Sequence, residues 1–142
     1  MNEIKTYTEK VFDDARHIDE NGNEYWEARE LMLLFEYTEW CKFNGVINRA
    51  IINCKSSNYN VLDHFGDVDK MVYTGSNSKR KIIDYKLSRY ACYLIVLNCD
   101  SRKKVIALAK TYFAIQTRKQ ELSEKEYSDL LKMRKEYIGE NK

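Results

Sequence analysis

The chain has 142 residues, of which 44% are hydrophobic and 32% are charged, and its formal net charge is +2. A chain of this length buries about two thirds of its unfolded surface in one domain, so it needs neither a disulfide nor a metal to fold. The composition is typical of a soluble globular protein, no apolar run is long enough to span a membrane, and the first residues carry no secretory signal. We therefore expect a single cytoplasmic domain over residues 1–142.

The N-terminal segment predicts a helix followed by a hairpin. Apolar residues recur at helical spacing at Ile4, Tyr7, Val11, Phe12 and Ala15. The next segment contains Asn21-Gly22, the strongest two-residue hairpin signal, because both residue types tolerate a positive φ. We expect a helix over residues 1–17 and a short hairpin that pairs residues 16–21 with residues 23–26.

Two helices with a tight connection are predicted next. The first has an apolar face from Ala28 to Phe35. Thr38 can cap the second, whose apolar residues run from Trp40 to Cys54. Such a pair is compatible with a helix-turn-helix, in which the second helix enters the major groove of DNA, although most short helix pairs only pack together. The side chains of the second helix that can read bases are few, chiefly Lys42, Asn44, Asn48 and Arg49.

A β-hairpin is predicted in the middle of the chain. Residues 69–74 and 80–87 have the composition of strands, and Gly75-Ser76-Asn77-Ser78 between them has that of a turn. The turn is followed by three cations, Lys79, Arg80 and Lys81. A basic hairpin after two helices has the layout of a wing that touches DNA phosphates, because lysine and arginine gain affinity there by releasing counterions. An equally good interpretation is that the tip is merely solvated.

The following segment predicts a buried helix and then a basic one. Residues 90–97 (YACYLIVL) are apolar on every side, and Ser88 can cap this helix. After a break at residues 98–101, apolar residues return at helical spacing, and the new helix starts with Arg102, Lys103 and Lys104. Aromatic residues in these runs can stack on bases, but we interpret them as core; they are Tyr90, Tyr93, Tyr112 and Phe113.

The last segment predicts a separate helix. Ser123-Glu124-Lys125-Glu126 forms a capping box, whose hydroxyl and carboxylate satisfy two free N–H groups at a helix start. An apolar stripe follows at Tyr127, Leu130, Leu131, Tyr137 and Ile138. This stripe must be covered by the same domain, by a further C-terminal region or by a second subunit in a homodimer.

The near-neutral total charge hides two oppositely charged segments. Residues 79–119 contain 11 basic and 2 acidic residues, whereas residues 1–40 contain 4 basic and 11 acidic residues. One surface of such a chain can bind a polyanion, or the two segments can pair with each other.

No catalytic, cofactor or metal site is predicted. The cysteines form no CxxC pair or zinc pattern and are expected to be reduced and structural; they are Cys41, Cys54, Cys92 and Cys99. His17 and His64 do not lie at ligand spacing from carboxylates, and the chain has no nucleophile-elbow, phosphate-loop or zinc-protease motif. We interpret His64 as a capping or packing residue.

Four segments resemble a known family. They are Asp63-His64-Phe65, residues 75–80 (GSNSKR), residues 87–94 (LSRYACYL) and residues 112–118 (YFAIQTR). They resemble the bacterial DNA-damage-inducible protein D family, whose members contain a domain similar to the BRO N-terminal domain of viral and phage antirepressor-like proteins. The resemblance runs from Tyr25 to Leu122 and implies a role in the response to DNA damage, through a domain associated with DNA binding and without a known catalytic residue set.

Together these patterns predict an α+β fold, mainly helical with small antiparallel hairpins and compatible with a winged-helix-like arrangement. We expect residues 18–122 to form its core and residues 123–142 its C-terminal helix. The expected function is non-enzymatic DNA binding in an SOS-type damage response, with single- and double-stranded DNA both open. Phosphate contacts are expected from Lys79, Arg80, Lys81, Arg102, Lys103 and Lys104, with Arg89 and Arg118 as second choices.

A second function remains open. It is a protein-interaction module, an antirepressor-like or recombination-regulating adaptor that uses its acidic N-terminal surface or its C-terminal helix to bind a partner. An enzyme is the least favoured class.

Overall fold

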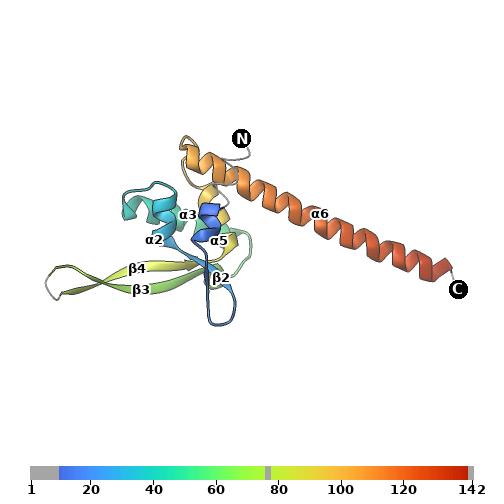
Figure 1. The fold of residues 1–142 in the computed structure, drawn as a ribbon, viewed down its shortest axis with the longest axis horizontal. Coiled ribbons are helices and arrows are strands. Elements are labelled where there is room, and N and C mark those ends of the chain that lie inside the picture. The colour runs from blue at the N-terminus through green and yellow to red at the C-terminus, as the bar shows by residue number, and fades with distance from the viewer. Residues whose placement is uncertain (1–9, 76–77, 141–142) are drawn as a thin grey trace. The chain divides into compact units, whose positions relative to one another are not determined.

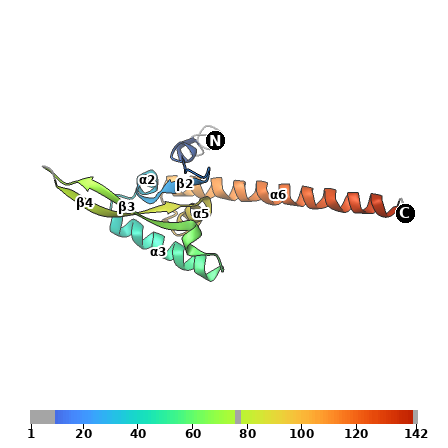
Figure 2. The ribbon, with the colours of Figure 1, turned by 90° about the horizontal axis from the view of Figure 1, so that it is seen from below.

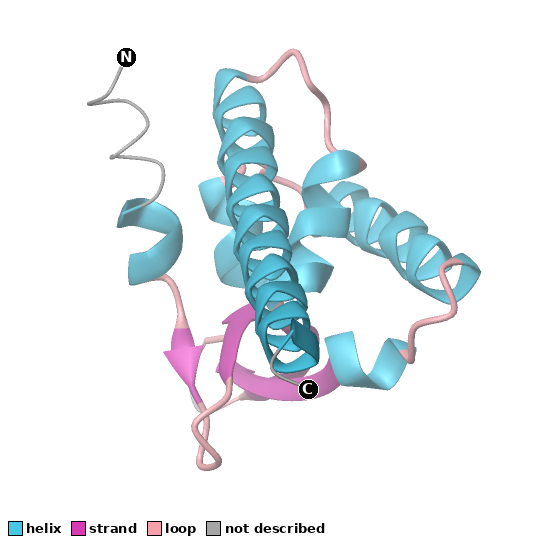
Figure 3. Cartoon of the chain, turned by 90° about the vertical axis from the view of Figure 1, so that its right-hand side faces the viewer, coloured by secondary structure: helices cyan, strands magenta, loops and turns pink. Residues whose placement is uncertain are grey.

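The structure is a computed structural model that describes residues 10–75 and 78–140, except for the side chains of residues 117, 118, 120–122, 127 and 135–140. The chain divides into two units, Met1–Lys110 and Thr111–Lys142. The first unit combines helices with a four-stranded antiparallel sheet in the order β1-β2-β4-β3, which confirms the predicted α+β class. Figure 3 shows the strands, in magenta, as one small sheet.

The predicted N-terminal hairpin is confirmed. Strand β1 (His17–Ile18) pairs with β2 (Glu24–Glu27), so that His17 lies opposite Tyr25. In the turn, Gly22 has a φ of 81°. The Asp19 carboxylate accepts hydrogen bonds from the backbone N–H groups of Asn21 and Asn23. The predicted first helix, over residues 1–17, is described from residue 10 onward; residues 10–14 are helical, but the helix ends there, because His17 already belongs to β1. Ile4 and Tyr7 lie outside the described residues.

A long two-stranded ribbon forms the other half of the sheet. Its strands are β3 (Phe65–Tyr73) and β4 (Lys79–Leu87), and β4 also pairs with β2. The predicted strands are confirmed, but β3 begins at Phe65 rather than at Asp69. The residues before position 69 include Asp67, and aspartate is uncommon in strands, so the sequence there did not indicate a strand. Pairing with β4 nevertheless holds residues 65–68 in the strand.

The two predicted helices are present as α2 (Ala28–Leu34) and α3 (Trp40–Ser56). The predicted cap at Thr38 is wrong, because the residue before the helix is Glu39 and its side chain makes no capping hydrogen bond. The stretch after α3 contains a single helical turn, α4 (Val61–His64), capped by Asn60. Figure 2 shows α3 along one side of the ribbon.

The core of the first unit lies around α5 (Arg89–Leu97), whose buried residues are Ala91, Cys92, Leu94, Ile95 and Val96. The predicted burial of this helix is confirmed for its middle but not for its end, where Leu97 is 47% exposed. The Ser88 hydroxyl caps α5 by accepting from the N–H of Ala91 at 3.1 Å, which confirms the predicted helix start. On the N-terminal side, the indole of Trp26 stacks on Phe12 and donates to the Phe12 carbonyl at 2.9 Å. The Trp26 side chain is thereby held in the core.

The last helix, α6 (Lys104–Glu140), is continuous and belongs to both units. The predicted helix start at Ser123 is therefore wrong. A capping box stabilises a helix start only where the preceding chain is not helical, and neither proline nor glycine interrupts residues 104–138. No helix among the described residues is long and apolar enough to cross a membrane.

Burial within α6 changes along its length. Tyr112 and Phe113 are buried and their rings meet edge to face, as expected for core residues. Leu130, Leu131 and Met133 are exposed by 63%, 42% and 64%. The described part of the predicted C-terminal stripe is thus open to solvent in a single chain.

Candidate nucleic-acid interface

The three predicted cations of the hairpin are the first residues of β4, directly after the turn of the ribbon, and all are exposed. Figure 1 shows the two strands of this ribbon, β3 and β4, extending away from the helices. Lys79 lies opposite Tyr73 and Lys81 opposite Met71, so these four side chains project from the same face. The Lys79 ammonium is 5.5 Å from the centre of the Tyr73 ring. Arg80 projects from the other face. The end of the ribbon therefore offers positive charge on both of its faces.

These cations differ in their partners. The Lys81 ammonium is 3.0 Å from the Asp69 carboxylate, and both side chains are more than half exposed. Lys79 and Arg80 form no ion pair with any of the residues that the structure describes. A surface ion pair is weak in water, so all three cations can exchange their present surroundings for phosphate oxygens.

The second predicted group lies at the start of α6. The Arg102 guanidinium binds both carboxylate oxygens of Asp100, Nε to Oδ1 at 3.0 Å and Nη2 to Oδ2 at 2.9 Å, and the Arg102 backbone N–H also donates to Oδ1 at 3.0 Å. These hydrogen bonds lower the pKa of Asp100 to about 2. The Lys103 ammonium donates to the Glu36 carbonyl at 2.9 Å and lies 3.7 Å from the centre of the Tyr37 ring. The Arg102 side chain nevertheless remains 91% exposed.

The structure does not bring the two basic groups together. The end of the ribbon projects away from the start of α6 in both Figure 1 and Figure 2. Lys104 is exposed on the first turn of α6, next to Arg102 and Lys103 in sequence. A ligand that contacts all six predicted cations must therefore be extended.

Arg89, a second choice for phosphate contact, has a structural role. Its guanidinium binds Glu24 and lies 5.2 Å from the centre of the Trp26 ring. The hydrogen bonds from Arg89 hold the pKa of Glu24 below its ordinary value, although burial opposes this. The other second choice, Arg118, has its side chain outside the described residues.

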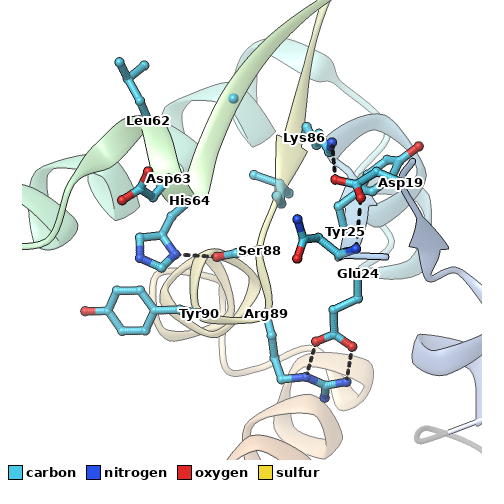
Figure 4. A pocket seen from close by; sticks show the side chains of 13 residues that line it. Asp19, Glu24, Tyr25, Leu62, Asp63, His64, Lys86, Ser88, Arg89 and Tyr90 are labelled. Atoms are coloured by element: carbon cyan, nitrogen blue, oxygen red, sulfur yellow. Dashed lines mark hydrogen bonds and ion pairs between the residues drawn. The ribbon is translucent and has the colours of Figure 1, made fainter. Parts of the chain in front are cut away.

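A cleft of about 530 Å³ lies where the first hairpin meets the end of β4 and the start of α5 (Figure 4). Two of its cations are paired: Lys86 lies 3.0 Å from Asp19, and Arg89 lies 2.9 Å from Glu24. The pKa of Asp19 is lowered by a hydrogen bond from the Asn23 N–H and by the Lys86 side chain. The acidic N-terminal segment thus neutralises part of the basic segment, as one of the two sequence interpretations expected.

His64 lines the same cleft and packs there. Its Nδ1 is 2.6 Å from the Ser88 hydroxyl, which can donate to it while accepting from the N–H of Ala91. The imidazole ring also contacts the ring of Tyr59, and it lies beside the ring of Tyr90, as Figure 4 shows. These contacts confirm the interpretation of His64 as a packing residue.

One group of potential metal ligands occurs among the described residues. Ligand atoms of His17, Glu27 and Glu30 all lie within 4.8 Å of one another. However, His17 Nε2 is already 3.1 Å from both carboxylate oxygens of Glu30, and Glu27 is paired with Lys70 at 2.5 Å. The group satisfies its own polar atoms, so we propose no metal for it.

The sequence did not reveal a third basic region, which lies in a cleft of about 510 Å³ beside α3. We call it the α3 cleft; its lining is Tyr37, Cys41, Lys42, Gly45, Val46, Arg49, Asn98, Cys99 and Asp100. Lys42 and Arg49 were expected only as readers of bases. Their proximity to residues 98–100 depends on the packing of α3 and could not be read from the sequence. The one feature of the sequence that could have indicated this site is Gly45, because a glycine inside a helix is unfavourable unless packing or function requires it.

The first unit is thus a small α+β domain whose sheet continues into a basic two-stranded ribbon. Residues 14–114 match the BRO family, N-terminal domain, and the chain belongs to this family. It is also 49% identical to DNA damage-inducible protein D of Escherichia coli (strain K12) over 115 residues. That match covers 81% of this chain and 42% of the relative, so the chain spans less than half of the relative's length. No solved structure matches the chain.

Proposed function

We propose that this chain is a non-enzymatic, cytoplasmic DNA-binding module of a bacterial SOS-type damage response. The observation that carries the proposal is the end of the ribbon, where Lys79 and Arg80 are exposed and not ion-paired with described residues. Membership of the BRO family and likeness to a protein named for its induction by DNA damage support the biological setting. In this proposal Lys79, Arg80 and Lys81 bind phosphates, together with Arg102, Lys103 and Lys104.

The physical basis is the release of counterions. Each phosphate that a lysine or arginine neutralises frees a condensed cation from DNA, so affinity falls as salt rises. If six phosphates are neutralised on a duplex, the logarithm of the binding constant falls with the logarithm of salt concentration with a slope of about −5. The number of contacts can therefore be read from a salt series.

The test is fluorescence-anisotropy binding to single- and double-stranded oligonucleotides across a salt series. Substitution of Lys79, Arg80 and Lys81 by alanine should weaken binding and reduce the slope by about 3 on duplex DNA. A matched control replaces three exposed lysines elsewhere, Lys55, Lys125 and Lys132, and removes the same net charge. Equal losses in the two variants would show that only total charge matters, and salt-independent binding would contradict the proposal.

The exposed apolar residues of α6 favour a second function. Leu130, Leu131 and Met133 present apolar surface on the second unit, which a partner protein or a second copy of the chain can cover. A protein-interaction module of the antirepressor or recombination-adaptor kind should capture its partner equally well when Lys79–Lys81 are reversed to glutamate. It should lose capture when Leu130 and Leu131 become glutamate; the opposite pattern would exclude this function.

A further inference from the structure

We propose that the α3 cleft binds a phosphate of the nucleic-acid backbone, with the bare helix backbone at Gly45 as its floor. This inference rests on the proposed function for the identity of the ligand. It adds a third contact region, in addition to the end of the ribbon and the start of α6, and assigns Lys42 and Arg49 to phosphate rather than to bases.

The charges around the cleft favour an anion. Lys42 and Arg49 come from α3 and are exposed. Two further cations lie near the residues that close the other side of the cleft: the Lys103 ammonium lies 3.7 Å from the centre of the Tyr37 ring, and the Lys110 ammonium bonds to the Ser101 hydroxyl. Lys42 and Arg49 are therefore the cations that line the cleft, and Lys103 and Lys110 add positive charge close to it.

Few negative charges oppose these cations. Asp100 is the one carboxylate in the lining, and Arg102 binds it through two hydrogen bonds. At the rim, Lys42 lies 3.3 Å from Glu39, but both side chains are at least 60% exposed and the pair is weak. The cleft therefore keeps an excess of positive charge, unlike the paired cleft near His64.

Gly45 gives an independent argument. Glycine inside a helix destabilises the helix relative to alanine, because the backbone of a glycine has more conformational entropy in the unfolded chain and loses more of it on folding. Gly45 lies within the 17-residue helix α3, has no positive φ, and a Cβ added to it would meet no atom within 4 Å. Neither backbone conformation nor packing in this chain requires glycine there. A ligand that approaches the helix backbone does require it.

The geometry suits phosphate in particular. Arginine and lysine both bind phosphate through charge-assisted hydrogen bonds, and Arg49 can bind two oxygens at once. Gly45 lies between Lys42 and Arg49, three residues after the first and four before the second, so all three share one face of α3. A phosphate over Gly45 lies within reach of both side chains.

The first test uses substitutions at Gly45 and the anisotropy assay on a duplex oligonucleotide. Gly45→Leu fills the hollow and should lower affinity about tenfold, equal to about 1.4 kcal/mol. Gly45→Ala should raise the melting temperature by a few degrees while still weakening binding, a combination that a purely structural glycine would not give. As a control, Asn53→Leu adds the same side chain at an exposed position of α3 outside the cleft and should leave affinity unchanged.

The second test uses Cys41, the exposed cysteine, which lines the cleft. The alkylation rate of Cys41 by the neutral reagent iodoacetamide is measured alone, with duplex, with dAMP and with inorganic phosphate. Protection of Cys41 by the duplex in wild type, and its loss in Gly45→Leu, is the expected result. Equal protection by dAMP at the same concentration would assign the phosphate to a free nucleotide instead of the backbone.

The two proposals fail in different ways. If wild type binds duplex but Cys41 is not protected and Gly45→Leu binds normally, the cleft is overturned and the ribbon function stands. If wild type binds no DNA, the ribbon function fails; protection of Cys41 by dAMP or phosphate would then keep the cleft as an anion site. Absence of all protection would overturn the cleft as well.

Discussion

The guanidinium of Arg89 holds the carboxylate of Glu24 through two hydrogen bonds, Nε to Oε2 at 2.9 Å and Nη2 to Oε1 at 3.2 Å. Glu24 begins β2 and Arg89 begins α5, so this contact joins the N-terminal hairpin to the buried helix. A bidentate pair that is only about one third exposed is the kind of surface ion pair that contributes measurably to stability.

Replacing Glu24 by glutamine should destabilise the protein by about 1 kcal/mol at neutral pH. The pKa of Glu24 is lowered in the folded state, so its stabilisation is present above the ordinary glutamate value of 4.5 and is lost as pH falls through the lowered pKa. Urea unfolding at neutral and acidic pH measures both effects. The difference between wild type and variant should shrink in acid; a constant difference would show that the charge of Glu24 is irrelevant.

Replacing Asp84 by alanine should destabilise the protein by about 3–5 kcal/mol. Asp84 is fully buried, accepts from the backbone N–H of Arg29 at 3.0 Å, and lies 2.9 Å from the Lys70 ammonium. The substitution leaves these donors without their acceptor inside the protein. Asp69→Ala on the exposed ribbon is the control, and it should change the free energy of unfolding, measured with urea, by less than about 0.5 kcal/mol. Similar losses in both variants would contradict the assigned role of Asp84.

Among the four cysteines, only Cys41 should react with iodoacetamide in the folded protein. Cys54, Cys92 and Cys99 are buried, and burial raises the pKa of Cys99 to about 11, so little thiolate forms there at neutral pH. Mass spectrometry should find one modification under native conditions and four in denaturant. Rapid native modification of Cys99 would show that the region around it opens.

Replacing Ser123 by alanine should leave the free energy of unfolding unchanged or raise it by up to about 0.5 kcal/mol, because Ser123 lies inside α6. If Ser123 capped a separate helix, the same substitution would cost about 1 kcal/mol. Ser88→Ala is the matched control, since Ser88 does cap α5 and should show that cost. Far-UV circular dichroism during urea unfolding gives both values.

Local chemistry explains which parts of the fold the sequence predicted. Asn21-Gly22 marked the first hairpin because Gly22 adopts a positive φ, and Ser88 marked α5 because its hydroxyl meets a free N–H. Ser123 has an equally good local signal, yet it lies within a continuous helix. Such a cap is satisfied only where the chain enters the helix from another conformation, and the sequence near Ser123 does not decide this.

The candidate site also has features that the sequence predicted and features that it did not. The exposure of Lys79–Lys81 followed from the predicted turn before them. The structural role of Arg89 depends on Glu24, which is far away in sequence and reaches it only through the sheet. The α3 cleft likewise needs α3 to pack beside residues 98–100. The spacing of residues in a single sequence indicates helices and strands, but it does not show which distant segments pack against one another.

The ion pair between Lys81 and Asp69 gives the end of the ribbon a counterion of its own. In the proposed function, a phosphate that binds Lys81 displaces the Asp69 carboxylate, and the carboxylate returns when the phosphate leaves. Such an exchange makes the contact at Lys81 weaker and shorter-lived than a contact made by Lys79 or Arg80, which form no ion pair with a described residue. Within the proposed function, Lys81 is therefore the cation of the ribbon end that most readily releases a phosphate and binds the next one.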